Sequence, residues 1–424
     1  MHPYKFKRDH QLRLFETLLS DMLDMQHSLV RLEKLIDWQG LERHFRPFYA
    51  DMGRPGVCLR LMLGLQLLKY IYGLSDEALC ERWIENPYFQ YFCGETFFQH
   101  NFPIERSGFS HFRNRVGIEA IEKLLQESLA SALASGALRL KDLRSVAIDT
   151  TVQEKAIAHP TQQGLLLRAI YKIGSAAKKA GIKVRQSYVR VAKQVSIKVG
   201  RYLHAKQMKR AKRELRWMRT RLGRLLKEVR RQITDDAPKY LVEALSKATR
   251  IFLQKRGDTD YLYAWHAPEV KCISKGKARN PYEFGCKVAL ATPIHAYGGK
   301  HFILQAIALH GNPYDGHTLQ RTLDKLHEIT GRMADYVYVD KGYRGHGIKA
   351  GPRIVHSGQR RGITPWLKKQ MRRRSVVEPI IGHAKNDGLL GRNYLKGHKG
   401  DQINAILSAV GFNFRQILSH LATA

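Results

Sequence analysis

The sequence predicts an α/β protein in which a mixed β-sheet core follows a helical N-terminal region and is interrupted by a basic helical insertion. Helical patterns fill the first part of the chain, alternating β-forming segments begin near Leu143 and return near Glu283, and a stretch rich in Lys and Arg separates them. The expected domains are a helical domain for DNA binding and dimerisation (1–140), a first part of the core (141–155), the insertion (156–270) and a second part of the core (271–424).

The charge of the chain points to a polyanionic partner. Its 424 residues are 44% hydrophobic, enough for two or three domains with a real core. The 72 Lys and Arg residues face only 37 Asp and Glu, a net charge of +35 that exceeds what solubility needs. Neutralised phosphates release counterions, so nucleic acid is the expected partner and an anionic membrane the alternative.

Other features exclude several classes of protein. The longest apolar run, residues 59–74, contains Arg60 and Lys69 and is short for a membrane span, so we expect a buried helix. The first sixteen residues lack the apolar core of a secretory signal. The five cysteines are odd in number and form no C-x-x-C pair, which argues against a disulfide framework or a structural zinc site. We therefore expect a protein of the reducing cytoplasm, bound to nucleic acid.

The N-terminal region contains two helices joined by a short turn. After the turn at residues 53–56, an apolar helix extends to about Tyr72, and a second helix begins at Asp76 with Ser75 as its N-cap. The outline fits a DNA-binding helix-turn-helix, but it equally fits two packed core helices. A further helix from Ser107 carries Arg113 and Arg115, which either meet phosphates or are solvated.

Residues 143–152 form the first strong predicted strand, which we expect to end on Asp149 and two threonines. An acid at a strand end is well placed to hold a metal, although Asp is also a common strand terminator.

The insertion is strongly basic. Residues 168–231 contain 22 Lys and Arg but only 2 acids, which is +20 of the net charge of +35. Apolar residues recur at helical spacing among the charges, so we expect amphipathic helices that contact DNA without sequence specificity. The expected contacts from one of these helices are Lys209, Arg210, Arg213 and Arg216.

Two strands are expected at residues 283–292 and 301–310, joined by a turn near Gly298. Residues 311–318 then approach the phosphate-binding sequence G-x-x-x-x-G-K-T, but His317 replaces its lysine. No other nucleotide signal accompanies this near match, so we expect no nucleotide cofactor.

The last segments add two more acids. Residues 335–340 predict a strand that ends on Asp340, followed by a Gly-rich turn. Residues 372–385 predict a loop that enters a helix, with Ser375 as N-cap, and place Glu378 and Lys385 two helical turns apart. The spacing Ser-x-x-Glu also fits a capping box, in which Glu378 only satisfies a backbone N–H. The apolar run at residues 403–414 is expected to cover the core.

Together these segments predict a metal site. Three carboxylates from two neighbouring strand ends and a helix are what two Mg²⁺ ions need, and Mn²⁺ is expected to substitute. Two such ions stabilise the attacking and leaving oxygens of a phosphodiester displacement. The rival acids Asp258, Asp260, Glu269 and Asp335 are weaker candidates because none ends a predicted strand.

These motifs resemble those of the DDE-type transposases of bacterial insertion sequences, of the IS-five type, which have a ribonuclease-H-like catalytic core. The resemblance covers most of the chain and includes Asp149-Thr-Thr-Val and Asp340-Lys-Gly-Tyr-Arg-Gly. In the C-terminal signature Y-(2)-R-(3)-E-(6)-K, Arg374, Glu378 and Lys385 are in register, but Met371 replaces the tyrosine.

The resemblance implies that Asp149, Asp340 and Glu378 bind the metal ions, and that Arg374 and Lys385 contact DNA near the cleaved phosphate. Arg372, Arg373 and Lys341 lie beside them in sequence and are expected to contact DNA as well. The resemblance also implies that a homodimer binds the terminal inverted repeats and hydrolyses a phosphodiester at each end, and that the freed 3′-hydroxyl then attacks target DNA and joins the strand to it. A nuclease or resolvase without strand transfer, and a non-catalytic DNA-binding protein derived from a transposase, are the alternatives.

Overall fold

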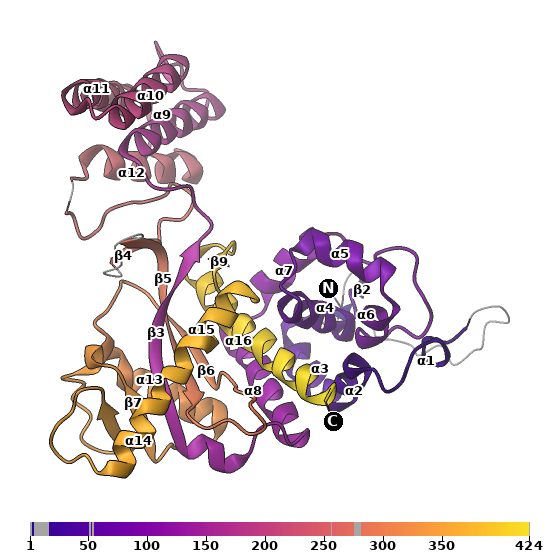
Figure 1. Cartoon of the computed structure of the whole chain (residues 1–424). Coiled ribbons are helices and arrows are strands. Elements are labelled where there is room, and N and C mark those ends of the chain that lie inside the picture. The colour runs from indigo at the N-terminus through magenta and orange to yellow at the C-terminus, as the bar shows by residue number, and fades with distance from the viewer. Residues whose placement is uncertain are drawn as a thin grey trace. The chain divides into compact units, whose positions relative to one another are not determined.

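The computed structural model describes residues 2–3, 17–50, 52, 55–255, 257–274 and 281–423. The chain divides into two compact units, unit 1 (Met1–Glu154 and Cys286–Ala424) and unit 2 (Lys155–Gly285) (Figure 1). Most of the N-terminal segment predicted to lack a secretory signal, and residues 53–54 of the predicted first turn, lie outside the described residues. Among the described helices, none is both long and apolar enough to cross a membrane.

The N-terminal part of unit 1 is helical, as predicted. The long apolar helix α4 is buried at twelve of its thirteen residues, so it is a core element. Ser75 caps the next helix, because its side chain accepts a hydrogen bond of 3.0 Å from the backbone N–H of Ala78. The elements are β1 (His2–Pro3), α1 (Leu19–Met22), α2 (Ser28–Leu35), α3 (Trp38–Phe45), η1 (Arg46–Phe48), β2 (Pro55–Gly56), α4 (Leu59–Ile71), α5 (Asp76–Glu85), α6 (Pro87–Phe92), α7 (Ser107–Arg115), α8 (Ile118–Ala134) and η2 (Leu140–Arg144).

The pair α4 and α5 has the outline of a helix-turn-helix but not a surface suited to DNA. The exposed positions of α5 are Glu77, Glu81, Arg82 and Glu85, three acids and one base. Acidic side chains repel the phosphates of DNA, so this face is poorly suited to bind in a DNA groove. The core-packing interpretation therefore accounts better for this pair.

A mixed seven-stranded sheet confirms the predicted α/β class. Along its main path the order is β4-β5-β3-β7-β8, with β6 on β5 and β9 on β3. The predicted hairpin is confirmed, because β5 and β6 are antiparallel, whereas β3, β7 and β8 are parallel. The strands are β3 (Ser145–Lys155), β4 (Lys271–Ser274), β5 (Tyr282–Pro293), β6 (Gln305–Leu309), β7 (Tyr336–Val339), β8 (Arg353–His356) and β9 (Arg392–Asn393).

In unit 1 the two faces of the sheet are covered by different helices, because successive side chains of a strand point to opposite sides. Val146 and Val337 join the large core beneath the N-terminal helices and the C-terminal helix α16. Ala147 and Tyr338 join a smaller cluster on the other face. The remaining elements of unit 1 are α13 (Asp315–Thr330), η3 (Lys341–Tyr343), α14 (Pro365–Arg373), η4 (Arg374–Val376), α15 (Val377–Asn386) and α16 (Gly397–Leu421).

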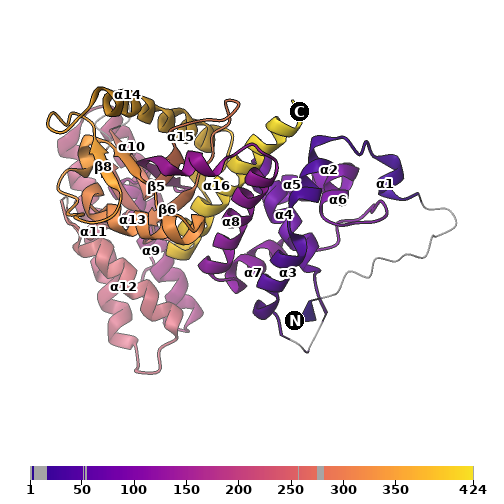
Figure 2. The same cartoon turned by 90° about the horizontal axis from the view of Figure 1, so that it is seen from below.

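Helix α16 covers the sheet as residues 403–414 predicted, and it lies between the sheet and the N-terminal helices (Figure 2). Its side chains also pair with the edge strand β6. Gln402 accepts a 2.7 Å hydrogen bond from the N–H of Ala308 and donates one of 3.1 Å to the carbonyl of Ala306. An edge strand exposes unpaired backbone groups, so this contact fixes the start of α16 against the sheet.

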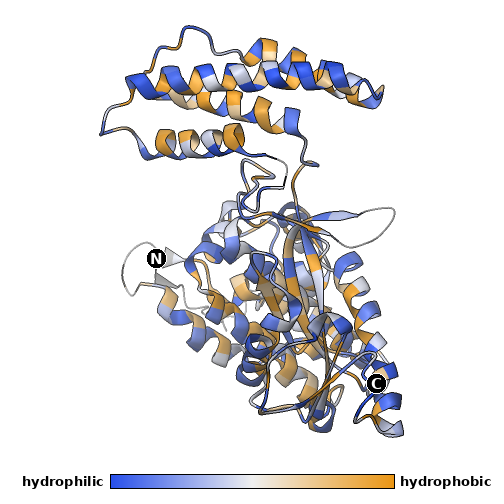
Figure 3. Cartoon of the chain, turned by 90° about the vertical axis from the view of Figure 1, so that its left-hand side faces the viewer, coloured by the Kyte–Doolittle hydropathy of each residue, from blue (hydrophilic) through white to orange (hydrophobic). Residues whose placement is uncertain are grey.

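Unit 2 contains the predicted basic amphipathic helices. Leu, Ile, Val and Met side chains form its core, and polar and apolar residues alternate around each helix (Figure 3). Lys209, Arg210, Arg213 and Arg216 are all exposed on α11. The helices are α9 (Gln162–Lys179), α10 (Val189–His204), α11 (Met208–Gln232) and α12 (Lys239–Leu253).

Candidate active site

The two aspartates lie on adjacent parallel strands. Asp340 directly follows β7, as predicted, but the prediction that Asp149 ends its strand is wrong, because β3 continues to Lys155. Ala147 pairs with Tyr338, and each aspartate is two residues further along its strand. Strand alternation therefore puts Asp149 and Asp340 side by side on the face of the smaller apolar cluster.

A nearly continuous helical segment, α14–η4–α15, packs on that same face through Leu367 and Val377. The prediction of a loop entering a helix is wrong, because residues 372–374 are already helical. Ser375 is not an N-cap: its hydroxyl donates a 3.0 Å hydrogen bond to the carbonyl of Arg372. The residue before α15 is Val376 and no described side chain caps this helix, so the capping-box interpretation does not account for Glu378, whose side chain is 68% exposed.

Arg374 connects this helix to the sheet. Its guanidinium lies 3.0 Å from a carboxylate oxygen of Asp149 and 3.9 Å from one of Glu378. The spacing i, i+4 puts Arg374 and Glu378 on one face of the helical segment. The guanidinium of Arg374 thus lies close to both Asp149 of β3 and Glu378 of α15.

The electrostatics of Asp149 show a carboxylate in need of positive charge. Burial raises its pKa above the usual value, and the nearby Asp340 raises it further. The backbone N–H of Thr150 and the guanidinium of Arg374 lower it in part. Two close carboxylates with one arginine are therefore under-compensated, which is the environment that a divalent cation stabilises.

A fourth acid, Asp315 at the start of α13, was not predicted. A Cβ placed on Gly342 would lie 3.0 Å from a carboxylate oxygen of Asp340 and 3.4 Å from one of Asp315, so the two acids converge there. The ammonium of Lys287 lies 3.0 Å from Asp315 and donates a 2.8 Å hydrogen bond to the carbonyl of Pro313.

The glycine of the near P-loop match explains how Asp315 reaches this place. A Cβ on Gly316 would lie 3.0 Å from the backbone oxygen of Arg344, so only glycine permits this close approach of α13 to the turn after β7. The sequence signal was present in Gly316, but it indicated backbone packing rather than phosphate binding.

Tyr343 lies close to the charged side chains of Asp149, Asp315, Asp340 and Arg374. It is 1% exposed, and its hydroxyl has no hydrogen-bond partner among the described residues. Burial raises the pKa of Tyr343, and so do the charges of Asp315, Asp149 and Asp340, whereas Arg374 lowers it. The phenol therefore stays protonated.

The other predicted DNA contacts differ in their surroundings. Lys341 and Arg372 are exposed, and Arg373 contacts the imidazole of His295 at 2.6 Å. Lys385 is half-buried on α15, the helix that carries Glu378.

Two arginines of α7 have structural partners instead. Arg113 is 6% exposed and makes two hydrogen bonds to Asp76, at 2.8 and 3.2 Å. The guanidinium of Arg115 lies over the ring of Tyr49. These contacts give both side chains a role in packing, so we leave them out of the proposed DNA surface.

Three of the four rival acids form ion pairs, and the fourth accepts a hydrogen bond from the backbone. Asp260 contacts Arg250 at 2.6 Å, and Asp335 contacts Arg144 at 2.6 Å. Glu269 pairs with Lys155 at 2.9 Å, with both side chains buried. Asp258 accepts a hydrogen bond from the N–H of Lys255.

Two comparisons with known proteins give matches. A family model described as "Transposase domain (DUF772)" matches residues 17–115. A Rhizobium meliloti protein described as "Uncharacterized protein ORF8 in nfe locus" is 46% identical over 194 residues, which is 46% of this chain and 94% of that protein. No solved structure matches the chain at a significant level.

Proposed function

The chain belongs to a transposase family, and from this premise we propose that it is a DDE transposase that cleaves and joins DNA with two Mg²⁺ ions. The observation that carries the proposal is the convergence of Asp149, Asp340 and Glu378 on one face of the sheet. They come from two adjacent strands and a facing helix, and Arg374 contacts two of them.

The residues fit a magnesium site. Carboxylate oxygens are the ligands that this hard cation prefers, and burial, with the nearby Asp340, raises the pKa of Asp149, so a cation beside it would favour its ionised form. Asp149, Asp340 and Glu378 would hold the ions, with Asp315 beside them. Bound ions would supply charge stabilisation to the attacking and leaving oxygens of a phosphodiester.

The chain's own side chains position the DNA. Arg374 holds Asp149 and Glu378 in place, and its remaining N–H groups can meet a phosphate oxygen. Lys385, Lys341, Arg372 and Arg373 surround the acids with positive charge that attracts the DNA backbone. The buried Tyr343 stays neutral and adds no further negative charge beside the acids.

The sheet supports a ribonuclease-H-like core. The parallel strands β3 and β7 carry the two aspartates, and the hairpin β5–β6 continues the sheet on the other side of β3. This arrangement is the mixed sheet that such a core requires, with a helix bringing the third acid.

A homodimer would hold both ends of the insertion sequence at once. Unit 2 supplies the proposed non-specific DNA surface. Its helix α11 exposes Lys209, Arg210, Arg213 and Arg216 along two turns. Replacing all four with alanine should lower the slope of log affinity against log salt by up to about 3.6, because each lost phosphate contact removes about 0.9. An unchanged slope in a fluorescence titration would place DNA binding elsewhere.

The test of the proposed function is cleavage of a plasmid that carries the gene's own flanking DNA. With Mg²⁺, the wild type should cut at the flanks and produce joined products, whereas Glu378→Gln should bind the DNA without cutting. Cuts without joined products would indicate a nuclease or resolvase. Salt-sensitive binding without any cutting by the wild type would indicate a non-catalytic DNA-binding protein.

A further inference from the structure

A second cluster of metal-binding side chains lies in unit 1, apart from the carboxylates of the candidate active site. Cys286, His310 and Asp401 each present one ligand atom, and these atoms lie within 4.8 Å of one another. A fourth side chain, His398, joins them, because its Nδ1 is 2.8 Å from the Nδ1 of His310. We propose that these four residues bind a zinc ion that fastens α16 to the sheet.

The distances match a tetrahedral zinc site. Zinc bonds of about 2.3 Å to sulfur and about 2.0 Å to nitrogen place a sulfur and a nitrogen ligand about 3.6 Å apart, and two nitrogen ligands about 3.4 Å apart. The Sγ of Cys286 is 3.4 Å from the Nδ1 of His310, and that nitrogen is 3.8 Å from a carboxylate oxygen of Asp401. The distance between sulfur and nitrogen is slightly shorter than its ideal value, and the two imidazole nitrogens, 2.8 Å apart, would have to move apart by rotation of the rings to admit the ion.

The donor set selects the metal. A thiolate with two imidazoles and a carboxylate is softer than the oxygen ligands that Mg²⁺ prefers, and this combination suits zinc. The thiolate and the carboxylate carry two negative charges, which a divalent ion neutralises. Asp401 is 2% exposed and Cys286 is 5% exposed, and burying two such groups in ionised form is costly without a cation.

The surroundings of the cluster support a built site. Asn393 donates a 2.8 Å hydrogen bond to one carboxylate oxygen of Asp401, while the other oxygen faces His310. Such a contact orients a metal-binding carboxylate. Gln153 of β3 donates a 3.1 Å hydrogen bond to the backbone oxygen of Asp401, which fixes the first turn of α16.

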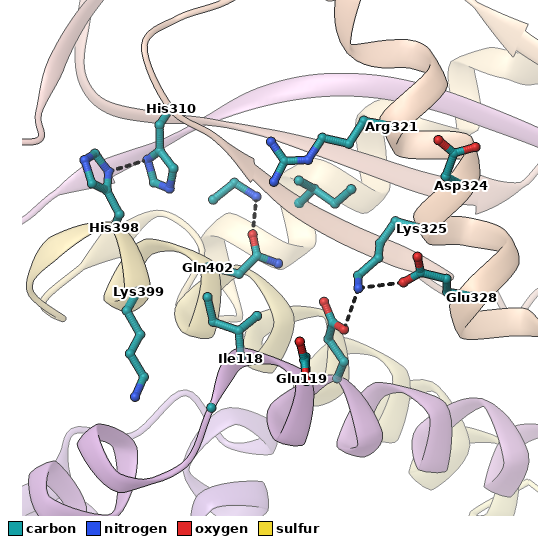
Figure 4. A pocket seen from close by; sticks show the side chains of 14 residues that line it. Ile118, Glu119, His310, Arg321, Asp324, Lys325, Glu328, His398, Lys399 and Gln402 are labelled. Atoms are coloured by element: carbon teal, nitrogen blue, oxygen red, sulfur yellow. Dashed lines mark hydrogen bonds and ion pairs between the residues drawn. The ribbon is translucent and has the colours of Figure 1, made fainter.

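The four residues come from three separate elements, so a bound ion would join them. Cys286 lies on β5, His310 directly follows β6, and His398 and Asp401 lie one turn apart on α16. Four protein ligands close the coordination sphere, which is typical of a structural rather than a catalytic zinc site. His310 and His398 also line a pocket of about 800 Å³, where their rings face each other, and this pocket gives the ion a route of entry (Figure 4).

The proposed zinc site does not depend on transposase activity, and zinc content and cleavage are measured separately. The full chain is purified without a histidine tag, and its zinc is counted by elemental mass spectrometry. One zinc per chain is expected in the wild type and in the controls Cys272→Ser and His111→Ala. His398→Ala and Cys286→Ser should lose it. Asp340→Asn should retain zinc even if cleavage is lost.

Cobalt substitution identifies the ligands. The wild type loaded with Co²⁺ should show a thiolate-to-cobalt charge-transfer band that is absent in Cys286→Ser. His398 is exposed on the first turn of α16, so His398→Ala should fold even if Cys286→Ser does not, and circular dichroism checks this. A wild-type chain with no zinc and no cobalt band, or zinc retained fully in His398→Ala, would overturn the proposal.

Discussion

Two neighbouring residues of β5, Cys286 and Lys287, contact two different clusters of possible metal ligands. Lys287 contacts Asp315 of the carboxylate site, whereas the Sγ of Cys286 lies 3.4 Å from the Nδ1 of His310. Successive side chains of a strand alternate between faces, so the proposed oxygen site and the proposed sulfur and nitrogen site lie on opposite faces of one sheet. The pleat of a single strand would thus keep two kinds of metal ligand apart.

The largest effect is expected from Asp340→Asn, which removes one ligand from the oxygen site alone. Cleavage in Mg²⁺ should fall by about 10³-fold or more, because charge stabilisation of the reacting oxygens is lost. DNA binding and zinc content should stay at wild-type levels. A cleavage assay and a zinc determination on the same preparation check both, and cleavage that survives in Mg²⁺ would contradict the assignment of Asp340.

His398→Ala should lose zinc but keep cleavage, and its effect should be smaller than that of Asp340→Asn. Losing the proposed zinc removes an ion that binds only the folded chain, so the melting temperature should fall by about 4 °C or more. Cleavage measured well below that temperature should remain near that of the wild type. Differential scanning calorimetry makes the comparison, and an unchanged melting temperature would show that the cluster does not stabilise the fold.

Asp315→Asn tests the acid that the sequence did not predict. Asp315 lies beside Asp340 and is paired with Lys287, so its loss should lower cleavage by about 10 to 100-fold, as for residues that orient metal ligands. Asp324→Asn, on the same helix but on the side of the pocket, is the matched control. Equal activities of the two variants would remove Asp315 from the site.

Arg374→Gln should change the pH dependence of cleavage. The guanidinium lowers the pKa of Asp149, which burial and Asp340 raise, so removing it lets that pKa rise further. Asp149 must be ionised to hold a cation, so the acidic limb of the cleavage profile should move to higher pH. The rate in Mg²⁺ is followed across the acidic range with the wild type in parallel, and an acidic limb at the same pH in both would contradict this role.

Local patterns predicted much of the fold. Alternation identified β3, β5 and β7, helical spacing identified α4 and the basic helices of unit 2, and the cap at Ser75 was in its predicted place. The end of β3 was misplaced because pairing with neighbouring strands extends it past Asp149 to Lys155, which Asp and Thr alone would not indicate.

The contents of the two sites depended on contacts between distant parts of the chain. Asp149 and Glu378 are 229 positions apart in sequence, and the order of predicted strands and helices, together with the resemblance to a known family, grouped them before the fold was known. The cysteine spacing argued against zinc, because that argument considers neighbours in sequence, whereas the ligand atoms of Cys286, His310 and Asp401 come within 4.8 Å of one another only in the folded chain. Gly316 permits the close approach of α13 to the turn after β7, but only the packing of α13 shows that this approach brings Asp315 near Asp340.

The most direct test of the account locates the metals themselves. Crystals of the full chain, purified with its zinc and soaked in Mn²⁺ in place of Mg²⁺, would be measured on both sides of the zinc and manganese absorption edges. Manganese should lie among Asp149, Asp340 and Glu378, and zinc among Cys286, His310, His398 and Asp401. Anomalous density that is absent from the three carboxylates at saturating Mn²⁺ would contradict the proposed metal-dependent active site.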